Sequence, residues 1–206
     1  LDPAERACLH REMGQAMEGL FGAETGAVAA QLARHFDEGG IPLKAAAYRL
    51  QAGQGACHMS AHHEAAAHLS RGLELLEDVP PGPERMQMEL SLQTLLGTTL
   101  ITTFGYAAPQ VERAFARART LCHALGDPVQ VIPVLFGLCL YHMVHGEIRL
   151  AREEGERFLP LTRQAGDAGY EIGCHFLLGA ITLYQGELER ARRHLEEAVA
   201  LHDVDR

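Results

Sequence analysis

Several residue types are scarce or missing in this chain of 206 residues. Tryptophan is absent, aromatic residues make up 6% of the chain, and Lys44 is the only lysine. Lys and Arg number 18 against 27 Asp and Glu, which gives a net charge of −9, and no long basic run occurs. The chain therefore lacks the cationic surface that a phosphate backbone requires, and direct nucleic-acid binding is not expected.

Long apolar runs are also missing. The most apolar segment, 129–144, is interrupted by Gln130, Pro133 and His142 and is shorter than the roughly 20 residues of a membrane-spanning helix, so no membrane crossing is expected. No Walker motif for nucleotide phosphates occurs. The sequence begins at Leu1 without Met or a leader pattern, and we interpret it as a piece of a longer polypeptide.

The five cysteines fit neither a disulfide framework nor a zinc site. They are odd in number, widely spaced and set in apolar helical patterns, at Cys8, Cys57, Cys122, Cys139 and Cys174. We interpret them as small buried side chains of a protein in a reducing cytoplasm.

Alanine and leucine dominate what is present, with 30 and 29 copies, and both favour helices. Gly, Pro and Asp divide the chain into about ten amphipathic segments that come in pairs. Asp2 with Pro3 and Ser60 are predicted helix starts, Gly126 is a predicted helix end, and Asp127 with Pro128 restart the chain. The predicted helices before the last four cover 3–21, 25–38, 42–58, 61–78, 84–103 and about 109–125.

Two turn motifs recur after 40 residues: Gly126-Asp127 as Gly166-Asp167, and Gly146-Glu147 as Gly186-Glu187. Small residues also recur in pairs. Three pairs are 12 residues apart and the second is 17 apart: Gly53 with Ala65, Gly97 with Ala114, Cys139 with Ala151, and Gly179 with Ala191. Antiparallel helices can approach within about 8 Å only where the crossing point lacks bulk, so these positions predict stacked helical hairpins.

The last unit, with Leu178, Gly179, Ala191, Leu195 and Ala198, resembles the tetratricopeptide (TPR) pattern. That resemblance implies an all-α fold, a right-handed superhelix of about ten helices in antiparallel hairpins. Residues 1–40 are then a degenerate leading pair, and 41–206 hold the repeats. Their expected bounds are 41–79, 84–126, 127–166 and 167–206.

Longer runs are similar to the C-terminal repeats of large bacterial signalling proteins. The runs are LARHFDEGG, AAYRLQAGQGA, SAHHEAAAHLSRGLELLE, FGYAAPQVERAFARARTLC and HLEEAVALHD. In those proteins a cyclase, kinase or DNA-binding domain is joined to an AAA or STAND-type ATPase and then to TPRs. The resemblance implies a cytoplasmic, non-catalytic module for regulation or partner binding.

Two clusters could carry chemistry, and each also has a structural interpretation. His58, His62, His63, Glu64 and His68 suggest a metal, but their spacing is not that of HExxH, so we assign no metal. Cys139 and His142 share a helix face, yet Cys139 takes a small-residue packing position. The carboxylates pair at helical spacing, as Glu153 with Arg157 and Glu189 with Arg193, and indicate solvated faces. We expect neither catalytic residues nor a cofactor.

Partner binding is expected in a concave groove lined by the first helix of each late pair: Phe136, Leu140, Met143, Val144, Phe176, Ala180, Leu183 and Tyr184. This apolar set suits an apolar or amphipathic helix of a protein partner or of the parent chain. Core packing of the same residues, and a small-molecule inducer in the groove, are the alternatives. Apolar end faces also make a homodimer plausible.

Overall fold

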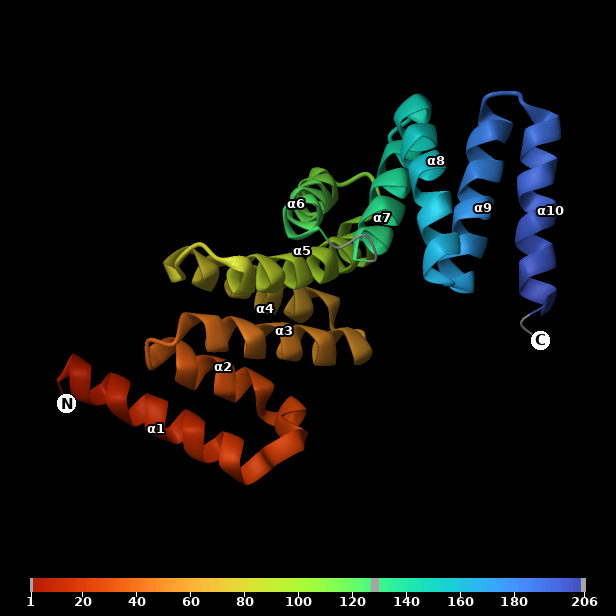
Figure 1. Ribbon diagram of the computed structural model, residues 1–206. Helices are drawn as coiled ribbons and strands as arrows, with labels where there is room; N and C mark the ends of the chain where they lie inside the picture. The colour runs from red at the N-terminus through yellow and green to blue at the C-terminus, as the bar shows by residue number, and fades with distance from the viewer. Residues whose placement is uncertain (1, 127–129, 205–206) are drawn as a thin grey trace. The chain divides into compact units, whose positions relative to one another are not determined.

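The computed structural model describes residues 2–126 and 130–204, and they form α-helices, two 3-10 segments and turns, without a β-strand. The expectation of an all-helical protein is therefore confirmed for these residues. The chain divides into two compact units, one up to Thr103 and one from Phe104 onward (Figure 1). None of the helices described is both long and apolar enough to cross a membrane.

The first unit holds five α-helices: α1 (Pro3–Phe21), α2 (Ala29–Glu38), α3 (Pro42–His58), α4 (His62–Leu75) and α5 (Pro83–Phe104). From α1 to α4 each helix packs on the next helix in the sequence. Gly53 on α3 makes room for Leu69 on α4, because a Cβ at Gly53 would lie 2.9 Å from Leu69 Cδ2. Gly72 on α4 similarly receives Leu92 of α5. The small residues thus allow close packing, as their spacing predicted.

The second unit repeats this arrangement with α6 (Pro109–Leu125), α7 (Val131–Val144), α8 (Ile148–Ala165), α9 (Ala168–Tyr184) and α10 (Leu188–Val204). Successive helices pack on one another, and α7 also contacts α9. Gly155 on α8 receives Leu178 of α9, and Gly179 on α9 receives Leu195 of α10. The core of this unit contains almost fully buried large side chains: Phe115, Leu138, Phe158, Leu177, Leu178 and Ile181.

Left-handed residues close the turns between helices. Gly126, Gly146, Gly166 and Gly186 have φ values of 69°, 83°, 68° and 77°. An L-residue in this conformation costs about 1–2 kcal/mol, which explains why glycine recurs there at the 40-residue period. The predicted restart at Asp127 and Pro128 falls outside the described residues.

Two predicted helix starts are wrong. Ser60 does not begin a helix with its side chain; it occupies a left-handed turn with φ 59°, and α4 starts at His62. The second helix starts at Ala29 rather than Thr25, because Gly22–Val28 form a 3-10 segment in which Glu24 departs from helical geometry. A glycine at each end of GAETG weakens the α-helix there, whereas the apolar pattern that buries Leu32 and Phe36 begins later.

Candidate functional site

Three of the exposed large apolar side chains lie on one face of α9. This helix starts at Asp167, whose carboxylate accepts a hydrogen bond of 3.0 Å from the N–H of Tyr170. Phe176, Leu183 and Tyr184 are 58%, 52% and 74% exposed. Positions seven and eight residues apart share a face of an α-helix, so the three side chains form one surface, which we call the α9 apolar face.

The eight residues of the predicted groove divide into two groups. Phe136, Leu140 and Met143 of α7 pack against a buried cluster of Cys139, Ala151, Leu177 and Ile181. Ala180 is half-buried, whereas Val144 is 50% exposed like the α9 apolar face. The core interpretation therefore suits the three residues of α7, and the groove itself stays a prediction.

Phe136 shows how α7 and α9 fit together. One edge of its ring lies where a Cβ of Gly173 would be 2.9 Å away, so glycine on α9 admits the aromatic ring. The ring also makes edge contacts with Phe158 and Tyr170, with centroids 5.9 and 5.8 Å apart. Phe136 consequently belongs to the packing between helices of this unit.

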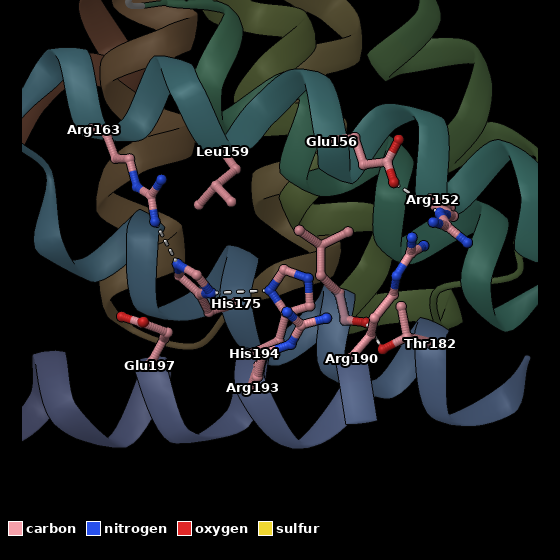
Figure 2. Close-up of a pocket in the computed structure, with 11 residues that line it drawn as sticks. Arg152, Glu156, Leu159, Arg163, His175, Thr182, Arg190, Arg193, His194 and Glu197 are labelled. Carbon is pink, nitrogen blue, oxygen red and sulfur yellow. Dashed lines mark hydrogen bonds and ion pairs between the residues drawn. The ribbon is translucent and has the colours of Figure 1, made fainter. Parts of the chain in front are cut away.

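A second feature of the same unit is a polar pocket between α8, α9 and α10 (Figure 2). Its volume is about 440 Å³. Four arginines and two histidines line it, and we call it the arginine–histidine pocket: Arg152, Arg163, Arg190, Arg193, His175 and His194. Glu156, Glu197, Leu159, Leu178 and Thr182 complete the lining.

His175 is the most buried titratable side chain of this pocket, with 3% exposure. Arg163 Nη2 donates to His175 Nε2 at 3.2 Å, and His175 Nδ1 lies 3.1 Å from His194 Nδ1. A guanidinium only donates, so His175 is neutral with its proton on Nδ1, which it donates to His194. Burial and then the charge of Arg163 lower the pKa of His175, and burial and then His175 lower the pKa of His194.

Ion pairs hold two of the arginines more tightly than the others. Arg152 bonds Glu156 and Glu187, each at 2.8 Å, and Arg163 bonds Glu171 at 2.8 Å. Arg190 uses Nη1 alone, for Glu187 at 2.9 Å. Arg193 has no hydrogen bond or ion pair within the described part of the chain.

Sequence reasoning missed this pocket because its arginines are scattered along helices that were interpreted as solvated. The predicted pairs Glu153 with Arg157 and Glu189 with Arg193 do not form; Arg157 lies 3.9 Å from Glu154, and Arg192 lies 3.9 Å from Glu189. The observed pairs are three residues apart rather than the predicted four, and neighbouring residues of a helix point about 100° apart. Glu189 therefore pairs with Arg192, and Arg193 points toward the pocket. Its spacing of three from Arg190 was the available signal.

The other candidate clusters have structural partners. Among the residues described, no group of three or more His, Cys, Asp and Glu is placed to hold a metal ion, and His68 contacts Arg49 at 3.1 Å. Cys139 donates to the Ala151 carbonyl at 3.3 Å, and burial raises its pKa to about 12. His142 instead contacts Glu147 at 2.6 Å, so Cys139 and His142 do not act as a pair.

The repeated helix pairs place the protein in the class of all-helical proteins built from packed hairpins. No family model matches the chain, and no curated protein matches it. Among solved structures it is similar to the crystal structure of BtubC (BKLC) from P. vanneervenii, with a TM-score of 0.69 and 13% identity. The match covers 99% of this chain and 92% of that chain, and at this identity it concerns the fold alone.

Proposed function

We propose that this chain is a non-catalytic helical-repeat module that binds a protein partner through the α9 apolar face. The observation that carries the proposal is the exposure of Phe176, Leu183 and Tyr184 on one side of one helix. Covering a large apolar side chain contributes about 1.5–3 kcal/mol, so three of them together can supply most of a moderate affinity. Large apolar side chains gathered in this way mark interaction sites more often than scattered ones do.

The occupant that suits this face is an amphipathic helix with a cationic polar side. In such a helix apolar residues recur at intervals of three, four and seven residues. A face of this kind can lie along Phe176 and Leu183, which are seven residues apart on α9. The net charge of −9 favours a partner of opposite charge and would accelerate their encounter. Val144 at the end of α7 would extend the contact if the helix crosses toward the Gly146 turn.

A fluorescent peptide of 18 residues tests this face, with Leu at helical spacing and Ala and Lys elsewhere. Tyr184→Ser and Phe176→Ser should each weaken its binding about tenfold, because each removes roughly one buried side chain of contact. Tyr106→Ser, which changes an exposed tyrosine outside the face, is the matched control and should bind normally. A peptide with the same residues in scrambled order should bind weakly.

Three results would contradict the proposal: equal binding by both peptides, equal binding by all variants, or loss of structure in Tyr184→Ser. A stable dimer in sedimentation that dissociates in Tyr184→Ser would assign the face to a second copy of the chain instead. Binding of an apolar metabolite that Tyr184→Ser abolishes would favour the inducer-sensing alternative.

We further propose a wider setting, on the strength of the repeats and the similar runs alone. The helix pairs would stack as a right-handed superhelix of the TPR kind, in a regulatory region of a cytoplasmic bacterial signalling protein with an ATPase. The free cysteines are compatible with a reducing compartment. An ATPase domain encoded in the same reading frame would support this setting, and a frame encoding the repeats alone would contradict it.

A further inference from the structure

The arginine–histidine pocket stands out by the number of arginines that line it. Four arginines and two glutamates form its lining, and two further carboxylates at its edge pair with three of the arginines: Glu171 with Arg163, and Glu187 with Arg152 and Arg190. The arginines come from two helices, Arg152 and Arg163 from α8 and Arg190 and Arg193 from α10. Arg193 has no carboxylate partner among the described residues, so a bound anion would stabilise its charge beside the three paired arginines.

Three of these arginines keep N–H groups available for a ligand. Among the residues described, nothing engages the donors of Arg193, Arg190 keeps Nε and Nη2, and Arg163 keeps Nη1 beyond its bonds to Glu171 and His175. Figure 2 shows the side chains of Arg190 and Arg193 reaching from α10 toward the space between the helices. One guanidinium fork satisfies a carboxylate, whereas a phosphate with three oxygens can accept from several.

The rest of the lining accommodates more than an inorganic ion. A volume of about 440 Å³ lies within the usual range for small-molecule sites, and Leu178 and Thr182, each 2% exposed, show that the pocket reaches the packed interior. Leu159 adds a partly buried apolar side chain. These residues can contact the uncharged part of a ligand.

We propose that the arginine–histidine pocket binds a small molecule carrying a phosphate group, with Arg163, Arg190 and Arg193 contacting the phosphate oxygens. This site is separate from the α9 apolar face: the α9 residues in its lining are His175, Leu178 and Thr182, and it uses none of the exposed apolar residues of that helix. Failure of one proposal therefore leaves the other intact.

Binding should also be linked to protonation. His175 faces Arg163 of α8, Glu171 of its own helix, and Glu197 and His194 of α10. His194 faces His175, Arg193 and the α8 pair of Arg152 and Glu156. An anion beside the two rings favours their charged forms, so affinity for an anion of constant charge should rise as the pH falls from about 7.5 to 5.5.

Calorimetric titration with ribose 5-phosphate, inorganic phosphate and ribose at constant ionic strength tests the proposal. The two phosphate-bearing probes should bind saturably and ribose should not. Arg193→Gln should weaken binding about tenfold and Arg190→Gln by a similar factor, because each removes charge-assisted hydrogen bonds. Arg192→Gln is the control: it removes an arginine of the same helix that is outside the lining and pairs with Glu189 and Glu196.

Glu197→Gln is the complementary variant, because it removes a negative charge from the lining without removing a donor. It should tighten phosphate binding several-fold. Sulfate, which keeps both charges across this pH range, serves as the probe for the pH profile, and His194→Gln should flatten that profile.

Absence of saturable phosphate binding would overturn the proposal, as would equal weakening in Arg192→Gln and Arg193→Gln, which indicates general charge attraction. Equal binding of ribose and ribose 5-phosphate would also overturn it. All five substituted side chains are at least partly exposed, so circular dichroism should show intact helices in each variant.

Discussion

Two three-helix segments, α2–α4 in the first unit and α8–α10 in the second, share one backbone plan and differ in their polar residues. Helices α3 and α9 each have 17 residues and begin at positions 42 and 168, an offset of 126 residues. At that offset Gly40 matches Gly166, with φ 69° and 68°. Gly53 and Gly179 each receive a leucine, Leu69 and Leu195 respectively.

At the same offset, the polar residues of the two segments differ in type. In the first segment Asp37 bonds Arg71 at 3.0 Å across α2 and α4, and Arg49 contacts His68. The corresponding residues of the second segment are Arg163, Glu197, His175 and His194, and they line the arginine–histidine pocket. Figure 2 shows Arg163 directed to His175. The packing residues therefore fix the helix pairs. The polar positions vary, and they form an ion pair in one segment and line a pocket in the other.

The largest effect on stability is expected from substitutions at Gly53 and Gly179, the glycines that contact Leu69 and Leu195. Leu69 is fully buried and Leu195 is 37% exposed, so only Leu195 has room to move aside. Gly53→Val should lower the free energy of unfolding by about 3 kcal/mol and Gly179→Val by about 1 kcal/mol. Urea unfolding followed by circular dichroism measures both, and equal losses would show that the two crossings are equally rigid.

A smaller effect is expected at the turn before the last helix of each segment. Ser60 and Gly186 occupy matching left-handed positions, with φ 59° and 77°. Ser60→Gly should stabilise the protein by about 0.5 kcal/mol, and Gly186→Ser should destabilise it by about 1 kcal/mol. Thermal midpoints report both changes. If Ser60→Gly lowers the midpoint, the serine side chain contributes more than its backbone strain costs.

The ion pair of the first segment should contribute less. The side chains of Asp37 and Arg71 are 25% and 44% exposed, so solvent screens the pair. Asp37→Asn should cost about 0.5 kcal/mol, and the loss should shrink in high salt. The matched change in the second segment is Arg163→Gln; it should cost more, because His175 and Glu171 both lose a partner. Equal losses of stability in Asp37→Asn and Arg163→Gln would contradict the idea that Arg163 has more partners than Asp37.

Protonation of buried histidines should have the smallest effect on stability at pH 7, and this effect should grow as the pH falls. Burial first and nearby positive charge second lower the pKa of His68, and burial and partner charges likewise lower the pKa of His175 and His194. The unfolded chain, with an ordinary histidine pKa near 6.5, binds protons that the folded chain does not. The free energy of unfolding should therefore fall as the pH drops below about 6.5.

In the second segment the two such histidines contact each other, whereas in the first segment His68 lies beside Arg49 and His35, whose pKa burial also lowers, contacts His10 of α1. His194→Gln should thus reduce the acid sensitivity more than His68→Gln does, as measured by urea unfolding between about pH 7.5 and 5.5. Acid sensitivity that neither variant changes would place its origin in other groups.

The helices and their crossings were predictable because short-range physics determines them. Ala and Leu at helical spacing, Pro42, Pro109 and the glycine turns are local signals, and Gly53 and Gly179 lie where predicted. The start of α2 was missed although the glycines of GAETG are a local signal, and the turn at Ser60 was missed because serine is also a common first residue of a helix. The pocket was missed because Arg193 of α10 and His175 of α9 line the same space only for one rotation of each helix about its axis. Sequence spacing does not determine that rotation to better than one residue.

The sequential packing of the helices has a consequence for how the chain folds. From α1 to α4, and again from α6 to α10, each helix contacts the next one along the sequence, so few loops must close over long stretches of chain. Folding can start at any hairpin and spread outward at speeds typical of helical proteins. Amide hydrogen exchange should accordingly be slower in the helices that pack between two others, α2, α3, α7, α8 and α9, than in α1 and α10.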